Sequence, residues 1–192
     1  KACQPVANHG PPPTRDDQGN LEGMASSGKI VPSHGSGAVS ATELLTSLYG
    51  EQYRICTTPN PQISLVLSTE RPIDLVELER LCDAVGWSRR PLRRVRKALE
   101  FSLLQVGLWR HDQRMPKLVG FARCTGDGVV EATVWDVAVH PLYQRVGLGK
   151  QLMVFVLDQL KELELDRVTL FADPEVVGFY EDQGWELEPQ SR

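Results

Sequence analysis

Hydrophobic and polar residues alternate with two different periods from about residue 62 onwards. Ile63, Leu65 and Leu67 recur at every second position, which predicts a strand. Apolar residues at helical spacing then predict two successive helices, over residues 74–85 and 92–102. A glycine closes the first helix and a proline precedes the second, as is common at these two ends.

The second half of the chain is predicted to hold a meander of strands, followed by alternating helices and strands. The predicted strands are residues 103–109, 117–125, 132–139 and 167–171, with one more beginning at Trp185. The predicted helices are residues 147–163 and 174–183. This order predicts an α/β fold, in which about four helices flank a mixed sheet.

The first 60 residues are predicted to be a flexible arm that precedes a domain at residues 61–192. Residues 1–40 contain six Gly, five Pro and five Ser and no aromatic residue, so they offer little apolar surface to bury. Residues 41–49 favour a short helix, which a proline-containing segment at 57–61 interrupts. A transit-peptide remnant is one interpretation of the arm, although such peptides are usually poor in acidic residues and this one has three.

Composition narrows the classes of partner and cofactor. A net charge of −4 gives no general case for nucleic-acid binding. The four cysteines are widely spaced and form no Cys-x-x-Cys pair, so no metal site is expected. No apolar run approaches the roughly 18 residues that span a bilayer, so no membrane partner is expected.

The most informative segment runs from Val137 to Lys150, where an apolar strand enters a glycine-rich turn that opens a helix. Glycines at 147 and 149 allow ligand oxygens to approach the backbone. The first N–H groups of a helix have no intrahelical partner, and with the helix dipole they form a phosphate site. A nucleoside-triphosphate loop is not indicated, because Lys150 is followed by Gln rather than Ser or Thr.

Two motifs together resemble the GCN5-related N-acetyltransferases, the GNAT family. They are Gln144-x-x-Gly147-x-Gly149 after the strand 132–139, and Gly178-Phe179-Tyr180 followed by Gly184-Trp185. The resemblance covers about residues 62–188. The phrases at 135–139, 170–173 and 85–91 are similar to those of a plastid-type branch from plants, algae and cyanobacteria, which includes serotonin N-acetyltransferases and plastid protein acetyltransferases.

The resemblance implies the GNAT fold, acetyl-CoA as acetyl donor, and a plastid location. The pantetheine would lie along a splayed edge of strand 132–139, and the pyrophosphate would bind the N–H groups of the turn. Pro174 stands where many relatives have an Asn that contacts the cofactor, and proline has no N–H to offer. The implied cofactor-binding residues are Val137, Ala138, Val139, Gln144, Arg145, Val146, Gly147, Leu148, Gly149, Lys150, Asp173, Pro174, Glu175 and Tyr180.

Two residues are catalytic candidates. Tyr180 stands where the family places the tyrosine that protonates the departing CoA thiolate; the alternative is an aromatic residue that anchors its helix to the sheet. Asp136 is a carboxylate in an apolar strand and a candidate general base. The alternative for Asp136 is a structural carboxylate held by backbone N–H groups or by Arg123. The backbone N–H of Val137 is a candidate donor to the carbonyl oxygen that gains negative charge.

The acceptor is left open between protein amines, both α-amines and lysine ε-amines, and small arylalkylamines such as serotonin. A basic cluster at 89–97 is by default a solvated helix face; in the family it borders the acceptor entrance, where it would disfavour polycationic substrates. The chain ends soon after Trp185, whereas relatives usually add a further strand near the acceptor site. A binding module with little catalysis is therefore a further alternative.

Overall fold

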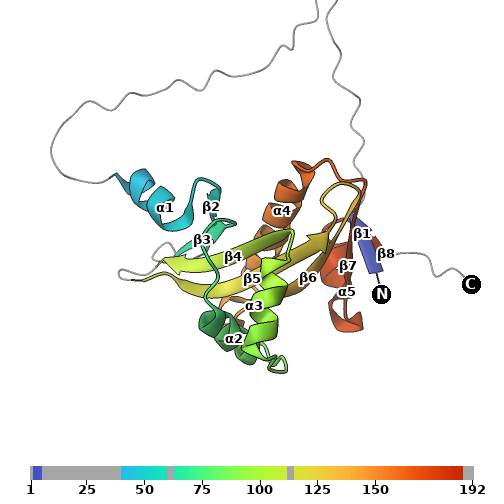
Figure 1. The fold of residues 1–192 in the computed structure, drawn as a ribbon, viewed down its shortest axis with the longest axis horizontal. Coiled ribbons are helices and arrows are strands. Elements are labelled where there is room, and N and C mark those ends of the chain that lie inside the picture. Colours follow the sequence, from blue (N-terminus) through green and yellow to red (C-terminus); the bar gives the residue numbers. More distant parts are fainter. Residues whose placement is uncertain (1, 6–39, 60–62, 112–114, 188–192) are drawn as a thin grey trace, which may run out of the picture.

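The structure is a computed structural model that describes residues 2–5, 40–59, 63–111 and 115–187. The described residues form one mixed sheet with strand order β2-β3-β4-β5-β6-β7-β1-β8 (Figure 1). The strands are β1 (Ala2–Pro5), β2 (Tyr53–Ile55), β3 (Ser64–Ser68), β4 (Leu104–His111), β5 (Lys117–Gly126), β6 (Glu131–Val139), β7 (Arg167–Phe171) and β8 (Trp185–Leu187). The predicted α/β fold with a mixed sheet is confirmed.

Strands β2 to β6 are antiparallel to their neighbours, whereas β6 and β7 run parallel. The connection from β6 to β7 is therefore a crossover, and it contains the longest helix. The helices are α1 (Ala41–Tyr49), α2 (Leu75–Ala84), α3 (Leu92–Glu100), α4 (Leu148–Lys161) and α5 (Val177–Glu181), with 3₁₀ turns η1 (Pro141–Tyr143) and η2 (Pro174–Val176). None of the described helices is long and apolar enough to cross a membrane.

The helices cover the two faces of the sheet and create a core on each side. Figure 1 shows α2 and α3 on the face opposite to α4. Successive residues of β3 separate these cores, because side chains alternate across a strand: Leu65 and Leu67 pack in the core that contains α4, and Val66 packs in the core that contains α2. Since both faces are covered, β3 is buried along its length apart from its first residue.

Residues 40–55 belong to the folded domain, which corrects the boundary predicted near residue 60. The side chain of Ser40 accepts a hydrogen bond from the N–H of Glu43 and caps α1. Tyr49, at the end of α1, is fully buried, and its hydroxyl is 3.0 Å from Nδ1 of His111. Strand β2 then pairs with β3. Local composition did not reveal this, because the buried partners are distant in sequence.

The segment predicted as an arm also contains a strand, β1, at residues 2–5. It pairs antiparallel with β7 on one side and with β8 on the other. Strand β1 therefore separates β7 from β8 in the sheet. The rest of the predicted arm, residues 6–39, lies outside the described residues.

Candidate functional site

Strands β6 and β7 separate where the glycine-rich turn approaches. Their parallel pairing ends at Val134 and Leu170, while β6 continues to Val139 and still pairs with β5. The backbone of β6 beyond Val134 therefore has an edge that β7 does not cover. Such an edge can take hydrogen bonds from an extended ligand, as a strand does. This open edge belongs to the predicted strand 132–139, and binding of the pantetheine along it stays a prediction.

A bulge in β6 lies at the start of this edge. Arg123 of β5 is opposite Trp135, and Phe121 is opposite Ala138, so β6 has an extra residue between these pairs. Asp136 lies in this bulge and has a φ of 52°. Asp is among the few non-glycine residues that tolerate the left-handed region, since its short side chain bonds locally. The bulge interrupts the regular alternation of side chains and re-aims them beside the open edge.

The turn after β6 presents a row of backbone donors. Arg145 and Gly147 both have positive φ, 65° and 82°, so left-handed residues stand on both sides of Val146. Within the described part of the chain, no backbone carbonyl accepts a hydrogen bond from the N–H groups of residues 145–150. The first bond of α4 runs from the Gln151 N–H to the carbonyl of Gly147. Consecutive N–H groups in this conformation form an anion-binding nest at a helix N-terminus.

Side chains hold the turn in place from two directions. Gln144 donates from Nε2 to the carbonyl of Val139 at 2.7 Å, which ties the turn back to the end of β6. Gln151 donates to the carbonyl of Thr57 and accepts from its N–H, at 2.9 and 2.8 Å. Leu148 is 1% exposed and anchors α4 in the core. Gln144 was predicted to bind the cofactor, and the observed bond gives its side chain a role in positioning the turn.

The second motif reaches the turn through an aromatic ring. Cζ of Phe179 is 3.3 Å from the position that a Cβ on Gly149 would occupy. Gly149 therefore admits the phenyl ring of α5, whereas Gly147 has open space where a Cβ would stand. Both glycines were predicted to allow close approach of a ligand, and the packing of Gly149 against α5 is a second role for this glycine.

Tyr180 is 8% exposed and belongs to the core on the α4 side of the sheet. Its ring meets Phe179 and Trp185 edge-on, with centroids 5.0 and 6.2 Å apart. These contacts fit the anchoring alternative, and the proton-donor role stays a prediction. Asp173, Pro174 and Glu175 are exposed in the turn after β7, and their contact with a cofactor also stays a prediction.

Asp136 is held by two arginines from different elements. Arg123 Nε donates to Oδ2 of Asp136 at 2.5 Å. The side chain of Arg123 is 15% exposed and that of Asp136 is 16% exposed. Arg90, from the loop between α2 and α3, places Nη1 at 3.2 and 3.4 Å from the two carboxylate oxygens. The ion pair with Arg123 matches the structural alternative given for Asp136. The contact with Arg90, 46 residues away, was not predicted.

A cavity of about 540 Å³ opens between α2, α3 and the sheet, and Asp136 is one of the residues that line it. Its apolar wall includes Leu78, Cys82, Val95, Ala98, Leu99 and Phe121. Arg89, Arg90 and Arg94 also line the cavity, so half of the basic cluster faces it. The other members, Arg93, Arg96 and Lys97, are exposed on α3 as a solvated helix face would be. A cavity of this size suits a small molecule or one side chain.

Burial raises the pKa of the cysteine thiols near these cores. The pKa of Cys124 rises to about 12 and that of Cys56 to about 11. Burial also raises the pKa of Cys82 in the cavity wall, and the negative charge of Asp136 adds to this effect. Thiols are therefore poor nucleophiles here. Among the described residues, no three His, Cys, Asp or Glu side chains are grouped so as to hold a metal ion.

A family of known proteins matches the part of the chain that contains this site. The family model described as "Acetyltransferase (GNAT) family" matches residues 73–185, more than half of the chain. The chain belongs to the GNAT family. The matched range includes the open edge of β6, the nest of amides and the aromatic motif of α5. Members of this family are acetyltransferases, so the enzyme prediction is confirmed and the non-catalytic alternative loses its support.

Relatives place this GNAT protein in the predicted branch. It is 54% identical over 162 residues to an "Uncharacterized N-acetyltransferase ycf52-like" of Prochlorococcus marinus, covering 84% of this chain and 90% of the relative. It is 37% identical over 142 residues to "GCN5-related N-acetyltransferase 2, chloroplastic" of Arabidopsis thaliana, covering 66% of this chain and 55% of the relative. The predicted resemblance to cyanobacterial, algal and plant members is confirmed.

Solved structures agree with the fold. A GNAT acetyltransferase of Streptococcus pneumoniae is similar with a TM-score of 0.54 and 31% identity, over 64% of this chain and 88% of that one. YhbS of Escherichia coli, solved with CoA, matches the fold with a TM-score of 0.51 and 23% identity, over 68% and 73%. GNAT acetyltransferases use acetyl-CoA, so the predicted acetyl donor is confirmed. The donor-rich turn and the open β6 edge fit its pyrophosphate and pantetheine.

Proposed function

We propose that this GNAT enzyme acetylates a primary amine whose apolar portion enters the cavity between α2 and α3. The observation that supports this proposal is the position of the cavity. Asp136 lines the cavity and lies in β6 just beyond Val134, where the open edge of the strand begins. An acceptor there would meet the acetyl donor from the opposite side of the strand. This arrangement would bring two substrates to one bulge in β6, which is the main requirement of a group transfer.

The residues of the chain divide the binding of acetyl-CoA between backbone and side chains. The amides of residues 145–150 would hold the pyrophosphate, with Arg145 and Lys150 adding charge. The backbone of Val137 and Val139 would pair with the pantetheine, although the Val139 carbonyl already accepts from Gln144. Bound acetyl-CoA supplies a thioester, whose acyl carbon is open to attack by an amine. The N–H of Val137 would donate to the thioester oxygen.

Tyr180 and Asp136 are the two residues proposed to take part in proton transfer, and their surroundings favour this role for Tyr180 more than for Asp136. Tyr180 would protonate the departing thiolate, which its phenol can do because it stays protonated near neutral pH. Asp136 is engaged by Arg123 and Arg90 at both oxygens. We therefore favour Asp136 as the group that binds the acceptor's charge and positions the bulge, over its role as general base. The protons that the acceptor nitrogen loses before and after its attack would then pass to water, and the Tyr180 phenol would regain its proton from water.

The shape of the cavity bears on the acceptor. Its wall is apolar apart from Ser88, Glu79, the arginines and their acidic partners, which favours an amine with a single charge and an apolar body. Small arylalkylamines meet this description. The α-amine of a protein whose first residue has an apolar side chain meets it as well, and we keep both classes within the proposal. A plastid location is also proposed, on the strength of the chloroplastic names of plant relatives.

The experiment that tests the function is an acetylation screen with isotopically labelled acetyl-CoA. The purified protein is incubated with a panel of amines and with a peptide library that varies the first residue, and products are identified by mass spectrometry. We expect label on single-charge amines with apolar groups, and CoA release in equal amount. Label confined to polycationic peptides, or no transfer to any amine, would overturn the proposal.

A further inference from the structure

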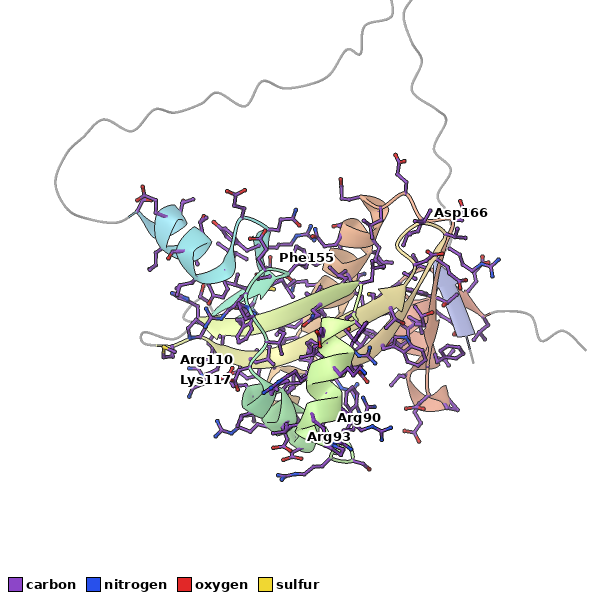
Figure 2. All side chains as sticks on the ribbon, viewed as in Figure 1. Arg90, Arg93, Arg110, Lys117, Phe155 and Asp166 are labelled. Carbon is purple, nitrogen blue, oxygen red and sulfur yellow. The ribbon has the colours of Figure 1, made fainter. Side chains whose placement is uncertain are left out.

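We propose that Arg90 is a displaceable counter-ion of Asp136, which the acceptor amine must replace, so that Arg90 sets the affinity for acceptors. The proposal rests on the proposed function. It gives the loop between α2 and α3 a part in choosing the substrate. Figure 2 shows Arg90 and Arg93 near the same end of α3, and only Arg90 is among the residues that line the cavity.

The two arginines on Asp136 differ in how firmly they are held. The Arg123 side chain is 15% exposed and donates at 2.5 Å from the neighbouring strand β5. The Arg90 side chain is 63% exposed, and its contacts of 3.2 and 3.4 Å are longer. Exposed ion pairs are weak because water competes for both charges. Arg90 can therefore leave Asp136 at small cost, while Arg123 keeps the carboxylate in place.

The neighbouring charges make this exchange selective. Arg89, beside Arg90, contacts both carboxylate oxygens of Asp83, at 3.1 and 2.6 Å. An amine enters the cavity as a cation, since primary amines are mostly protonated at neutral pH. Replacing one cation by another leaves the charge around Asp136 unchanged. The charged residues of the cavity lining are four arginines and three carboxylates, namely Arg89, Arg90, Arg94 and Arg123 with Glu79, Asp83 and Asp136. A second cation on the acceptor would therefore enter a lining that already has an excess of positive charge.

The position of Asp136 connects this exchange to the reaction. Asp136 is the bulged residue at the start of the β6 edge. An ammonium bound there lies next to the strand along which the acetyl donor would lie, and it must lose a proton to water before its nitrogen attacks the acyl carbon. Displacement of Arg90 thus delivers the nitrogen to the reacting region, and the apolar part of the acceptor fills the cavity behind it. Arg90 itself touches neither the acetyl donor nor the bond that forms.

The test compares Arg90→Gln with Arg93→Gln, which removes the same charge outside the cavity lining. The probe acceptor is phenethylamine. We expect Arg90→Gln to lower KM for phenethylamine about two- to fivefold, because a weak competing ion pair is gone. The kcat and the KM for acetyl-CoA should change less than about twofold, because an exposed ion pair contributes little free energy. Arg93→Gln should match the unaltered protein.

Three results would overturn the proposal. A higher KM for phenethylamine in Arg90→Gln would mean that Arg90 helps to bind acceptors. Equal effects of both substitutions would mean a general charge effect. Unchanged affinity of Arg90→Gln for phenethylamine, measured by calorimetry in the presence of unacetylated CoA, would also overturn it. That binding measurement needs no turnover, so a protein that acetylates no amine would refute the proposed function and still test Arg90.

Discussion

Phe179 of α5 packs its ring against Gly149 of α4, with Cζ 3.3 Å from the place of a missing Cβ. This contact joins the glycine-rich turn to the helix that carries Tyr180, two motifs about 30 residues apart in the sequence. The second glycine of Gly147-x-Gly149 therefore makes room for a side chain of the protein. The glycine-rich turn and the aromatic motif are packed as one unit.

A larger residue at 149 should disturb both. We expect Gly149→Val to lower the free energy of unfolding by about 1–3 kcal/mol, because its side chain must displace the phenyl ring. Affinity for acetyl-CoA should fall as the first turn of α4 shifts. Chemical denaturation and calorimetry measure the two effects. The control is Gly178→Val, where no atom stands within 4 Å of the added Cβ; equal losses in both variants would contradict the packing argument.

The ion pair between Asp136 and Arg123 should contribute to stability. Asp136→Asn keeps the shape but leaves the mostly buried Arg123 without a charged partner. Hydrogen bonds to charged groups are worth about 1.5–3 kcal/mol, and we expect a loss of that size in urea unfolding. The matched control is Asp158→Asn in the more exposed pair with Arg54, at 37% and 41%, where the loss should be under about 1 kcal/mol. The reverse ranking would refute this interpretation.

The predicted role of Tyr180 calls for a kinetic measurement. Tyr180→Phe keeps the ring that packs against Trp185 and removes the hydroxyl. If the phenol protonates the departing thiolate, the single-turnover rate should fall about 10²-fold or more, while the Kd for acetyl-CoA stays within a factor of two. Tyr53→Phe, on β2 at the far edge of the sheet, is the control. An unchanged single-turnover rate would leave Tyr180 with the anchoring role alone.

Thiol reactivity provides a test that depends on pH. Because burial raises the pKa of Cys82, Cys56 and Cys124, all three should be mostly protonated and slow to alkylate at pH 7, and faster as pH rises. Cys82 is the least buried of them and lines the cavity. It should label first, and phenethylamine should slow its labelling without protecting the other two. Peptide mass spectrometry separates the sites, and faster labelling of Cys124 than of Cys82 would count against the described burial.

The order of elements from β3 onwards and the glycine-rich turn could be predicted because both depend on local pattern. Alternation in β3 and the helical stripes of α2 and α3 are visible within a few residues, and so is the glycine motif. The left-handed Asp136 could not be predicted, since nothing nearby distinguishes a bulged residue from its neighbours in a strand. The Arg90–Asp136 contact and the burial of Tyr49 depend on tertiary packing between distant segments. Composition likewise gave no sign that residues 2–5 pair with β7 and β8.

The most direct test of the account fills the cavity. Ala98 on α3 lines it, and Ala98→Phe would occupy the space proposed for the acceptor's apolar group. Steady-state acetylation of phenethylamine should show a KM for the amine that is raised about tenfold or more, because the ring of the amine can no longer be buried in the cavity. The affinity for acetyl-CoA is measured by calorimetry. The Kd for acetyl-CoA should be unchanged. Normal acetylation by a folded Ala98→Phe protein would contradict the placement of the acceptor between α2 and α3.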